Sequence, residues 1–173
     1  EIADFYHKIS QAFENHQQVL DGSISDKQRK AILDELGIAG SKYREQVYAN
    51  HFSGSKKTVA IKELRSFTDL CIKYLNHSIK ANRRADGMYH AYNLMTVSSS
   101  EEVTISYLDE MLEGQVAVLS SGQLSSEECL DVLNGMKNSK LFREDQYSYL
   151  LYPNKELPRF TDKNVVSEDQ VNS

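Results

Sequence analysis

The chain has 173 residues, of which 40% are hydrophobic and 26% charged, and its formal net charge is -5. This composition is typical of an acidic, soluble globular domain and excludes a disordered chain, which would carry fewer apolar residues and a stronger charge imbalance. The negative charge, with basic residues grouped only in pairs, argues against nucleic acid as a partner. No apolar run approaches the roughly 18 to 20 residues of a membrane span.

The first residues already follow a helical pattern. The sequence starts at Glu1 without an initiator methionine, and the periodicity is under way at Ile2. We therefore expect a fragment of a longer polypeptide, whose compartment the sequence leaves open. Residues 2–20 place their apolar side chains on one stripe, which predicts an amphipathic helix.

A second helix is predicted from Ser25, because Gln28 three residues later completes a capping-box pattern. Gly37 and Gly40 interrupt its apolar pattern, and helical character then resumes to about residue 50. Both one kinked helix and two short helices fit this stretch. Residues 51–58 form a polar loop.

The longest helical signal covers about residues 61–83, with apolar side chains at steps of three and four. These are Leu64, Phe67, Cys71, Tyr74, Leu75 and Ile79. We expect this central helix to be the most buried element of the domain. Cys71 and Cys129 both lie in apolar stripes and are interpreted as thiols packed like small hydrophobic residues. No spacing typical of a metal site accompanies them, so we predict no metal and no cofactor.

Residues 97–102 are interpreted as a flexible connector, after which Thr104 or Ser106 is expected to cap a helix that ends near residue 120. Ser125 with Glu128 forms another capping box, so these two elements should make an antiparallel helical hairpin. Residues 142–152 fit either a short strand or one helical turn. Residues 161–173 are polar and without a period, which is typical of a disordered tail or a linker.

Two aromatic and polar clusters are the candidate ligand-binding residues. The first follows the central helix and comprises Asp86, Tyr89, His90, Tyr92 and Asn93. Its phenols, imidazole, amide and carboxylate are suited to binding a polar small molecule such as a sugar. The second lies near residues 143–152 and contributes Asp145 and Tyr147. Packing of the same aromatic residues against the domain explains both clusters equally well, and we assign no catalytic residue.

The sequence predicts an all-α fold of about six helices in antiparallel pairs, with one helical domain over residues 1–160. Our first hypothesis is a non-enzymatic interaction or accessory module that binds the rest of a parent polypeptide or another protein. The alternative is a helical part of a carbohydrate-active or other hydrolytic enzyme that contributes one wall of a substrate cleft. A homo-oligomer formed through the aromatic residues 147–160 is a further possibility. The motifs leave open whether the chain is an enzyme.

Overall fold

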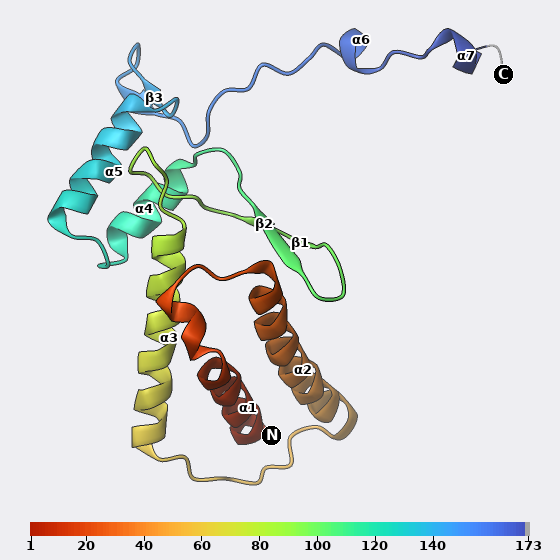
Figure 1. Cartoon of the computed structure of the whole chain (residues 1–173), viewed down its shortest axis with the longest axis vertical. Coiled ribbons are helices and arrows are strands. Elements are labelled where there is room, and N and C mark those ends of the chain that lie inside the picture. Colours follow the sequence, from red (N-terminus) through yellow and green to blue (C-terminus); the bar gives the residue numbers. More distant parts are fainter. Residues whose placement is uncertain (172–173) are drawn as a thin grey trace.

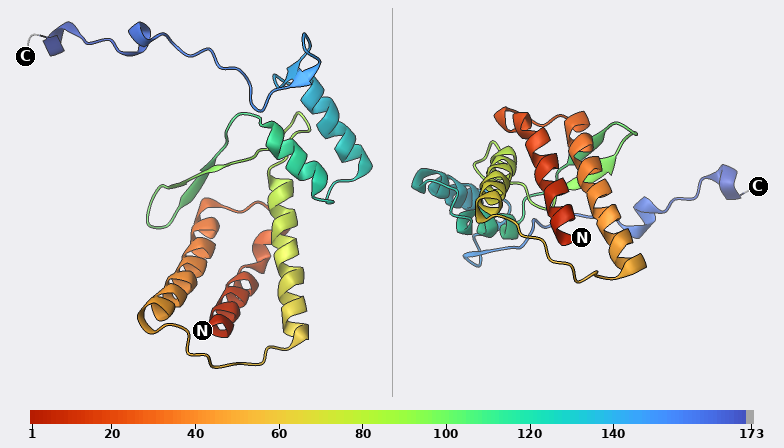
Figure 2. Two further views of the ribbon diagram at one scale, coloured as in Figure 1. Left: turned by 180° about the vertical axis from the view of Figure 1, so that it is seen from behind. Right: turned by 90° about the horizontal axis from the view of Figure 1, so that it is seen from below.

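The computed structural model describes residues 1–171, and most of them are helical. Three long helices, α1 (Ile2–Asn15), α2 (Asp26–Asn50) and α3 (Ile61–Ala81), form the lower part of the molecule in Figure 1. The short 3-10 helix η1 (Gln17–Asp21) follows α1 directly. α1 lies between the other two helices and contacts both of them, as the view from below in Figure 2 also shows.

Helix α2 is one continuous element in spite of its two glycines. It begins at the predicted capping box, in which the Gln28 amide donates to Ser25 Oγ (3.3 Å) and the Ser25 amide donates to Gln28 Oε1 (3.0 Å). Neither glycine needs a special conformation, because no φ in this helix is positive. The two-helix alternative for this stretch is therefore wrong.

Aromatic rings hold the three long helices together. Phe67 and Tyr74 of α3 contact rings of α1: Tyr6 meets Phe67 edge-on at 5.3 Å, and Phe13 lies 4.8 Å from Tyr74. The Tyr74 hydroxyl also donates to the Phe13 carbonyl oxygen (2.8 Å), so Phe13 positions Tyr74 through both a ring contact and a hydrogen bond. These contacts define the inner face of α3.

A β-hairpin follows α3, formed by β1 (Leu94–Val97) and β2 (Val103–Ser106) in antiparallel register. Residues 98–102 of the predicted connector make the hairpin turn, whereas Thr104 and Ser106 lie in a strand, so the predicted helix cap there was wrong. Val103, Thr104 and Ile105 form a β-branched run, which favours extended backbone. The next helix, α4 (Leu112–Ser120), begins well after the predicted cap.

Helices α4 and α5 (Ser126–Asn138) pack against each other in the upper part of Figure 1. The predicted capping box at the start of α5 is present, with the Glu128 amide donating to Ser125 Oγ (3.2 Å). The largest cluster of buried residues lies here and includes side chains from the loop that follows α3. Its members are Met88, Tyr89, Val118, Val132, Met136 and Leu141.

The chain ends in a second small hairpin and an extended arm. β3 (Phe142–Arg143) pairs with β4 (Ser148–Tyr149), so of the two alternatives for residues 142–152 the structure has short strands and not a helical turn. The arm then leaves the body and contains two single turns, α6 (Phe160–Lys163) and α7 (Glu168–Val171). The final two residues of the predicted tail lie outside the described residues. The fold is thus mostly helical with two small sheets, and the strict all-α prediction was wrong.

Candidate functional site

The first predicted cluster lies in the loop between α3 and β1, which folds back on itself as a tight turn. The Arg84 amide donates to the Met88 carbonyl oxygen (2.8 Å), and Arg83 and Tyr89 form an antiparallel bridge. Gly87 occupies the turn with φ +82°, a conformation that residues with a Cβ rarely adopt. The Asp86 carboxylate accepts a hydrogen bond from the Met88 amide (3.1 Å), which stabilises the turn.

Gln115 of α4 holds this loop through both the oxygen and the nitrogen of its side-chain amide. Its Oε1 accepts the Tyr89 amide (2.8 Å), and its Nε2 donates to the Tyr89 carbonyl oxygen (2.9 Å) and to that of Met111 (2.9 Å). The Gln115 side chain is fully buried and all three of its contacts are to backbone. The Tyr89 side chain itself is only 3% exposed and belongs to the hydrophobic core.

Glycines let the loop lie directly on both upper helices. A Cβ at Gly114 of α4 would lie 2.6 Å from the Ala91 Cβ. A Cβ at Gly135 of α5 would lie 2.6 Å from the Asp86 carbonyl oxygen and 2.9 Å from Met88 Cγ. No real Cβ tolerates such approaches, so glycine is required at both positions for this packing.

Ion pairs surround the same loop. Arg84 Nη2 donates to Asp86 Oδ2 (2.7 Å) and lies 3.7 Å from Glu110, while Arg83 Nη2 donates to Asp131 Oδ2 of α5 (2.8 Å). The hydrogen bond from Arg84 lowers the pKa of Asp86 below its ordinary value. These charges are mutually satisfied and hold the loop against its neighbours.

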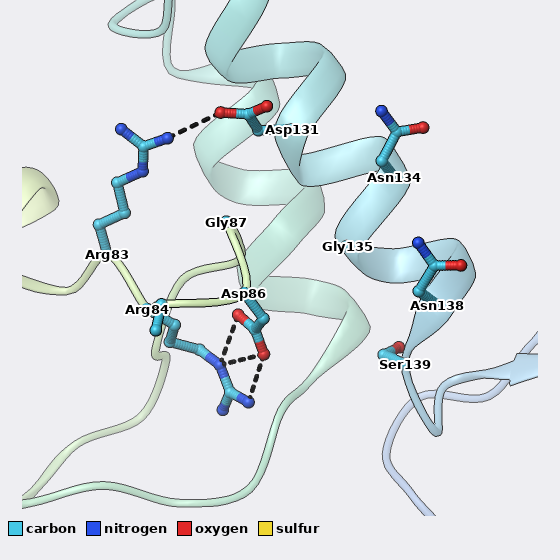
Figure 3. Close-up of a pocket in the computed structure, with 10 residues that line it drawn as sticks. Arg83, Arg84, Asp86, Gly87, Asp131, Asn134, Gly135, Asn138 and Ser139 are labelled. Carbon is cyan, nitrogen blue, oxygen red and sulfur yellow. Dashed lines mark hydrogen bonds and ion pairs between the residues drawn. The ribbon is translucent and has the colours of Figure 1, made fainter.

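A hollow of about 640 Å³ lies between this loop and α5, and Figure 3 draws the residues that line it. The side chains of Arg83, Arg84 and Asp86 come from the loop. Asp131, which pairs with Arg83, projects from α5 together with the amides of Asn134 and Asn138. The hollow therefore offers polar groups but presents its charges already neutralised by one another.

The remaining members of the first cluster lie farther along the loop. The His90 ring stacks on Tyr107 at 4.0 Å, and burial lowers the pKa of His90 below its ordinary value. The Tyr92 hydroxyl donates to Glu113 (2.6 Å), and Asn93 Nδ2 donates to the side-chain oxygen of Asn82 (2.6 Å). Asn93 lines a second hollow of about 580 Å³, which also includes Tyr107.

The second predicted cluster lies at the turn between β3 and β4. Asp145 accepts two hydrogen bonds from the Arg143 guanidinium (2.6 and 2.8 Å), and the exposed Tyr147 ring meets Phe142 edge-on. Among the described residues, no hydrogen bond, ion pair or ring contact joins this turn to residues 86–93. The structure thus places the seven candidate residues in three locations rather than in one cavity.

The largest feature that the sequence analysis missed is an apolar stripe on α3 that stays largely exposed in the described part of the chain. Its members, which we call the α3 stripe, are Ile61, Leu64, Thr68, Ile72 and Leu75. At 100° per residue these positions fall within about 80° of one another around the helix axis and extend over about 21 Å. Ile61 is 84% exposed, Leu64 45%, Ile72 44% and Leu75 62%. The prediction that this helix is the most buried element was therefore wrong.

The sequence analysis grouped Leu64 and Leu75 with Phe67 and Tyr74 on one apolar face that was expected to be buried, and the exposure of both leucines shows that this assignment was wrong. Apolar residues of α3 occupy more than one face, and periodicity alone does not tell which face another element covers. In the structure α1 covers the face of Phe67, Leu70 and Tyr74, and the α3 stripe remains open.

Comparisons with known proteins found no matching family model and no similar curated protein. Within the described part of the chain, no three His, Cys, Asp or Glu side chains form a group that could hold a metal ion. No helix of that part is both long and apolar enough to cross a membrane. Both cysteines are free thiols.

Proposed function

We propose that the chain is an interaction module that binds an amphipathic helix of a protein partner along the α3 stripe. The observation that carries this proposal is the exposure of four large aliphatic or β-branched side chains in one row on a long helix. Isolated apolar residues on a surface are ordinary, but a contiguous apolar row is typical of a contact site.

The total exposed surface supports a module that is completed by a partner. The chain exposes 12793 Å², whereas a compact monomer of this mass exposes roughly 8,600 Å². The excess is several times the roughly 800 Å² that each partner contributes to a standard protein interface. The extended arm accounts for part of this excess, and the open faces of the helices account for another part.

The spacing of the α3 stripe favours a helix as the occupant. Steps of three, four, four and three residues match the row that a second helix contacts when the two pack at a shallow angle. The only polar member, Thr68, donates its hydroxyl to the Leu64 carbonyl oxygen (2.8 Å), so its methyl group is available for an apolar contact. Beside the stripe, Arg65 and Asp69 provide one charge of each sign, and a partner of mixed charge is therefore suitable.

A site-specific photo-crosslinker tests the proposal in the cells that make the protein. Placed at Leu75 it should give discrete adducts whose mass identifies the partner, since this position lies in the α3 stripe. The matched control is the same group at Lys73, which is exposed on the same helix but lies outside the stripe. Adducts of equal yield from both positions, or none from Leu75, would refute the proposal.

Truncation of the stripe gives a quantitative second arm once the partner is in hand. Leu64→Ala and Leu75→Ala should each weaken binding by about 1 to 2 kcal/mol, as for ordinary contact residues at an interface centre. Lys73→Ala should leave the affinity unchanged. An affinity that is insensitive to both leucines would place the partner on another face.

A further inference from the structure

Strand β1 is an apolar strand that is open on both faces and along one edge. Leu94 is 52% exposed, Met95 55% and Val97 64%, and within the described residues the sheet contains only β1 and β2. Exposed apolar edge strands readily pair with other extended segments. None of the four residues of β1 is charged, so neither a lysine nor a proline protects this edge.

The hydrogen-bond pattern shows which backbone groups of β1 are free. The Ser98 amide donates to the Glu102 carbonyl oxygen (3.1 Å) across the hairpin. Because bonded and non-bonded pairs alternate in an antiparallel ladder, the backbone groups of Met95 and Val97 point to the outer edge. They have no hydrogen-bond partner among the described residues.

The opposite edge of the sheet is closed, in agreement with this alternation. The carbonyl oxygen of Val103, which faces Val97 in the register, points outward from β2 and accepts a hydrogen bond from Arg29 Nη1 of α2 (2.7 Å). Helix α2 also contacts β2. Only the β1 edge is therefore available for a third strand.

The same chain contains a short uncharged segment that fits this edge. Residues 164–167, between α6 and α7, read Asn-Val-Val-Ser and form neither helix nor strand. Val165 and Val166 are exposed, and the segment has no charge and no proline. Its length equals that of β1, and pairing the two would remove no charged group from water. Figures 1 and 2 show the arm extending away from the body, so the edge and the segment of one copy do not meet.

We propose that residues 164–167 of a second copy of this chain add to β1 as a third, edge-pairing strand, and that two copies exchange their arms reciprocally. Strand addition gives main-chain hydrogen bonds to the free groups of Met95 and Val97. Reciprocal exchange makes the same arm-to-edge contact twice, so two identical copies form a closed, symmetric dimer. The proposal is independent of helix binding by α3, because it uses a different face of the molecule.

The experiment measures the mass of the full chain by sedimentation equilibrium over a wide range of protein concentration. The wild-type protein should shift from one chain to two as concentration rises. Val97→Pro removes one outward amide and leaves the β1–β2 bonds intact, so it should weaken the dimer at least about tenfold. Val97→Thr, which keeps the amide, is the matched control and should still dimerise. Leu75→Ala should dimerise like the wild type.

The arm is tested separately with Val165→Pro/Val166→Pro and its control Val165→Thr/Val166→Thr. The proline variant should remain monomeric, yet it still has an intact β1 edge, just as Val97→Pro still has an intact arm. Mixing the two proline variants should therefore restore a heterodimer through one arm and one edge. A wild-type protein that stays monomeric, a dimer insensitive to either proline variant, or a mixture without heterodimer would each overturn the proposal.

Discussion

Replacing Gly135 by alanine should destabilise the protein, although alanine is the better helix former. In an open helical position the same change adds about 0.5 to 1 kcal/mol of stability. At Gly135 the new Cβ would lie 2.6 Å from the Asp86 carbonyl oxygen and 2.9 Å from Met88 Cγ. Overpacking of this kind costs about 1 to 3 kcal/mol. We expect a cost at the upper end of this range, because the nearest atom is a backbone oxygen that cannot turn away as a side chain can. We therefore expect a net loss of about 2 kcal/mol.

Gly37→Ala is the matched control, because Gly37 also lies within a helix and a Cβ there meets nothing within 4 Å. It should raise the free energy of unfolding by the propensity gain alone. Urea denaturation followed by far-ultraviolet circular dichroism measures both variants against the wild type. If the two alanine variants change stability by the same amount and sign, the loop does not lie on α5 as described.

Three further predictions concern the same structure and use the same unfolding measurement. Gly114→Ala should destabilise, and adding Ala91→Gly should recover part of the loss because it removes the Cβ that the new side chain meets; a purely additive double variant would contradict that contact. Phe67→Ala removes a packed ring and should lower the free energy of unfolding by about 3 to 5 kcal/mol. Leu75→Ala should change it by less than about 0.5 kcal/mol, because Leu75 is exposed. Similar losses in the two variants would contradict the exposure of the α3 stripe. Burial lowers the pKa of His90 below 6.5, so on acidification the unfolded chain takes up this proton before the folded chain does. The stability that His90 contributes is therefore present above pH 6.5 and is lost as the pH falls below it. His90→Gln should flatten this pH dependence of the unfolding free energy, and an unchanged profile would contradict the prediction.

The elements that sequence reasoning located correctly are those with local signals. Both capping boxes, at Ser25 and Ser125, open helices where they were expected. Helix α3 ends within two residues of the expected boundary. Such signals depend on hydrogen bonds between residues three apart, which the sequence displays directly.

The features that were missed depend on contacts between distant residues. The role of Gln115 follows only from Tyr89, which lies 26 residues away. Glycines within the predicted α4 and α5 were a usable signal, because glycine inside a helix often marks a close backbone approach. The partner of that approach, the loop after α3, was not visible from periodicity.

The loop is expected to stabilise the fold and the α3 stripe to bind a partner, and comparing variants of the two tests this difference. The charged side chains of the loop form ion pairs, and the backbone of Tyr89 is bonded to Gln115, so the polar groups of the loop stabilise the upper part of the molecule. The α3 stripe contributes little to folding because α1 packs on another face of the helix. Gly135→Ala should therefore lower stability without altering the affinity for a helical partner, whereas Leu75→Ala should do the reverse. A common effect of both variants on affinity would mean that the partner also contacts the loop.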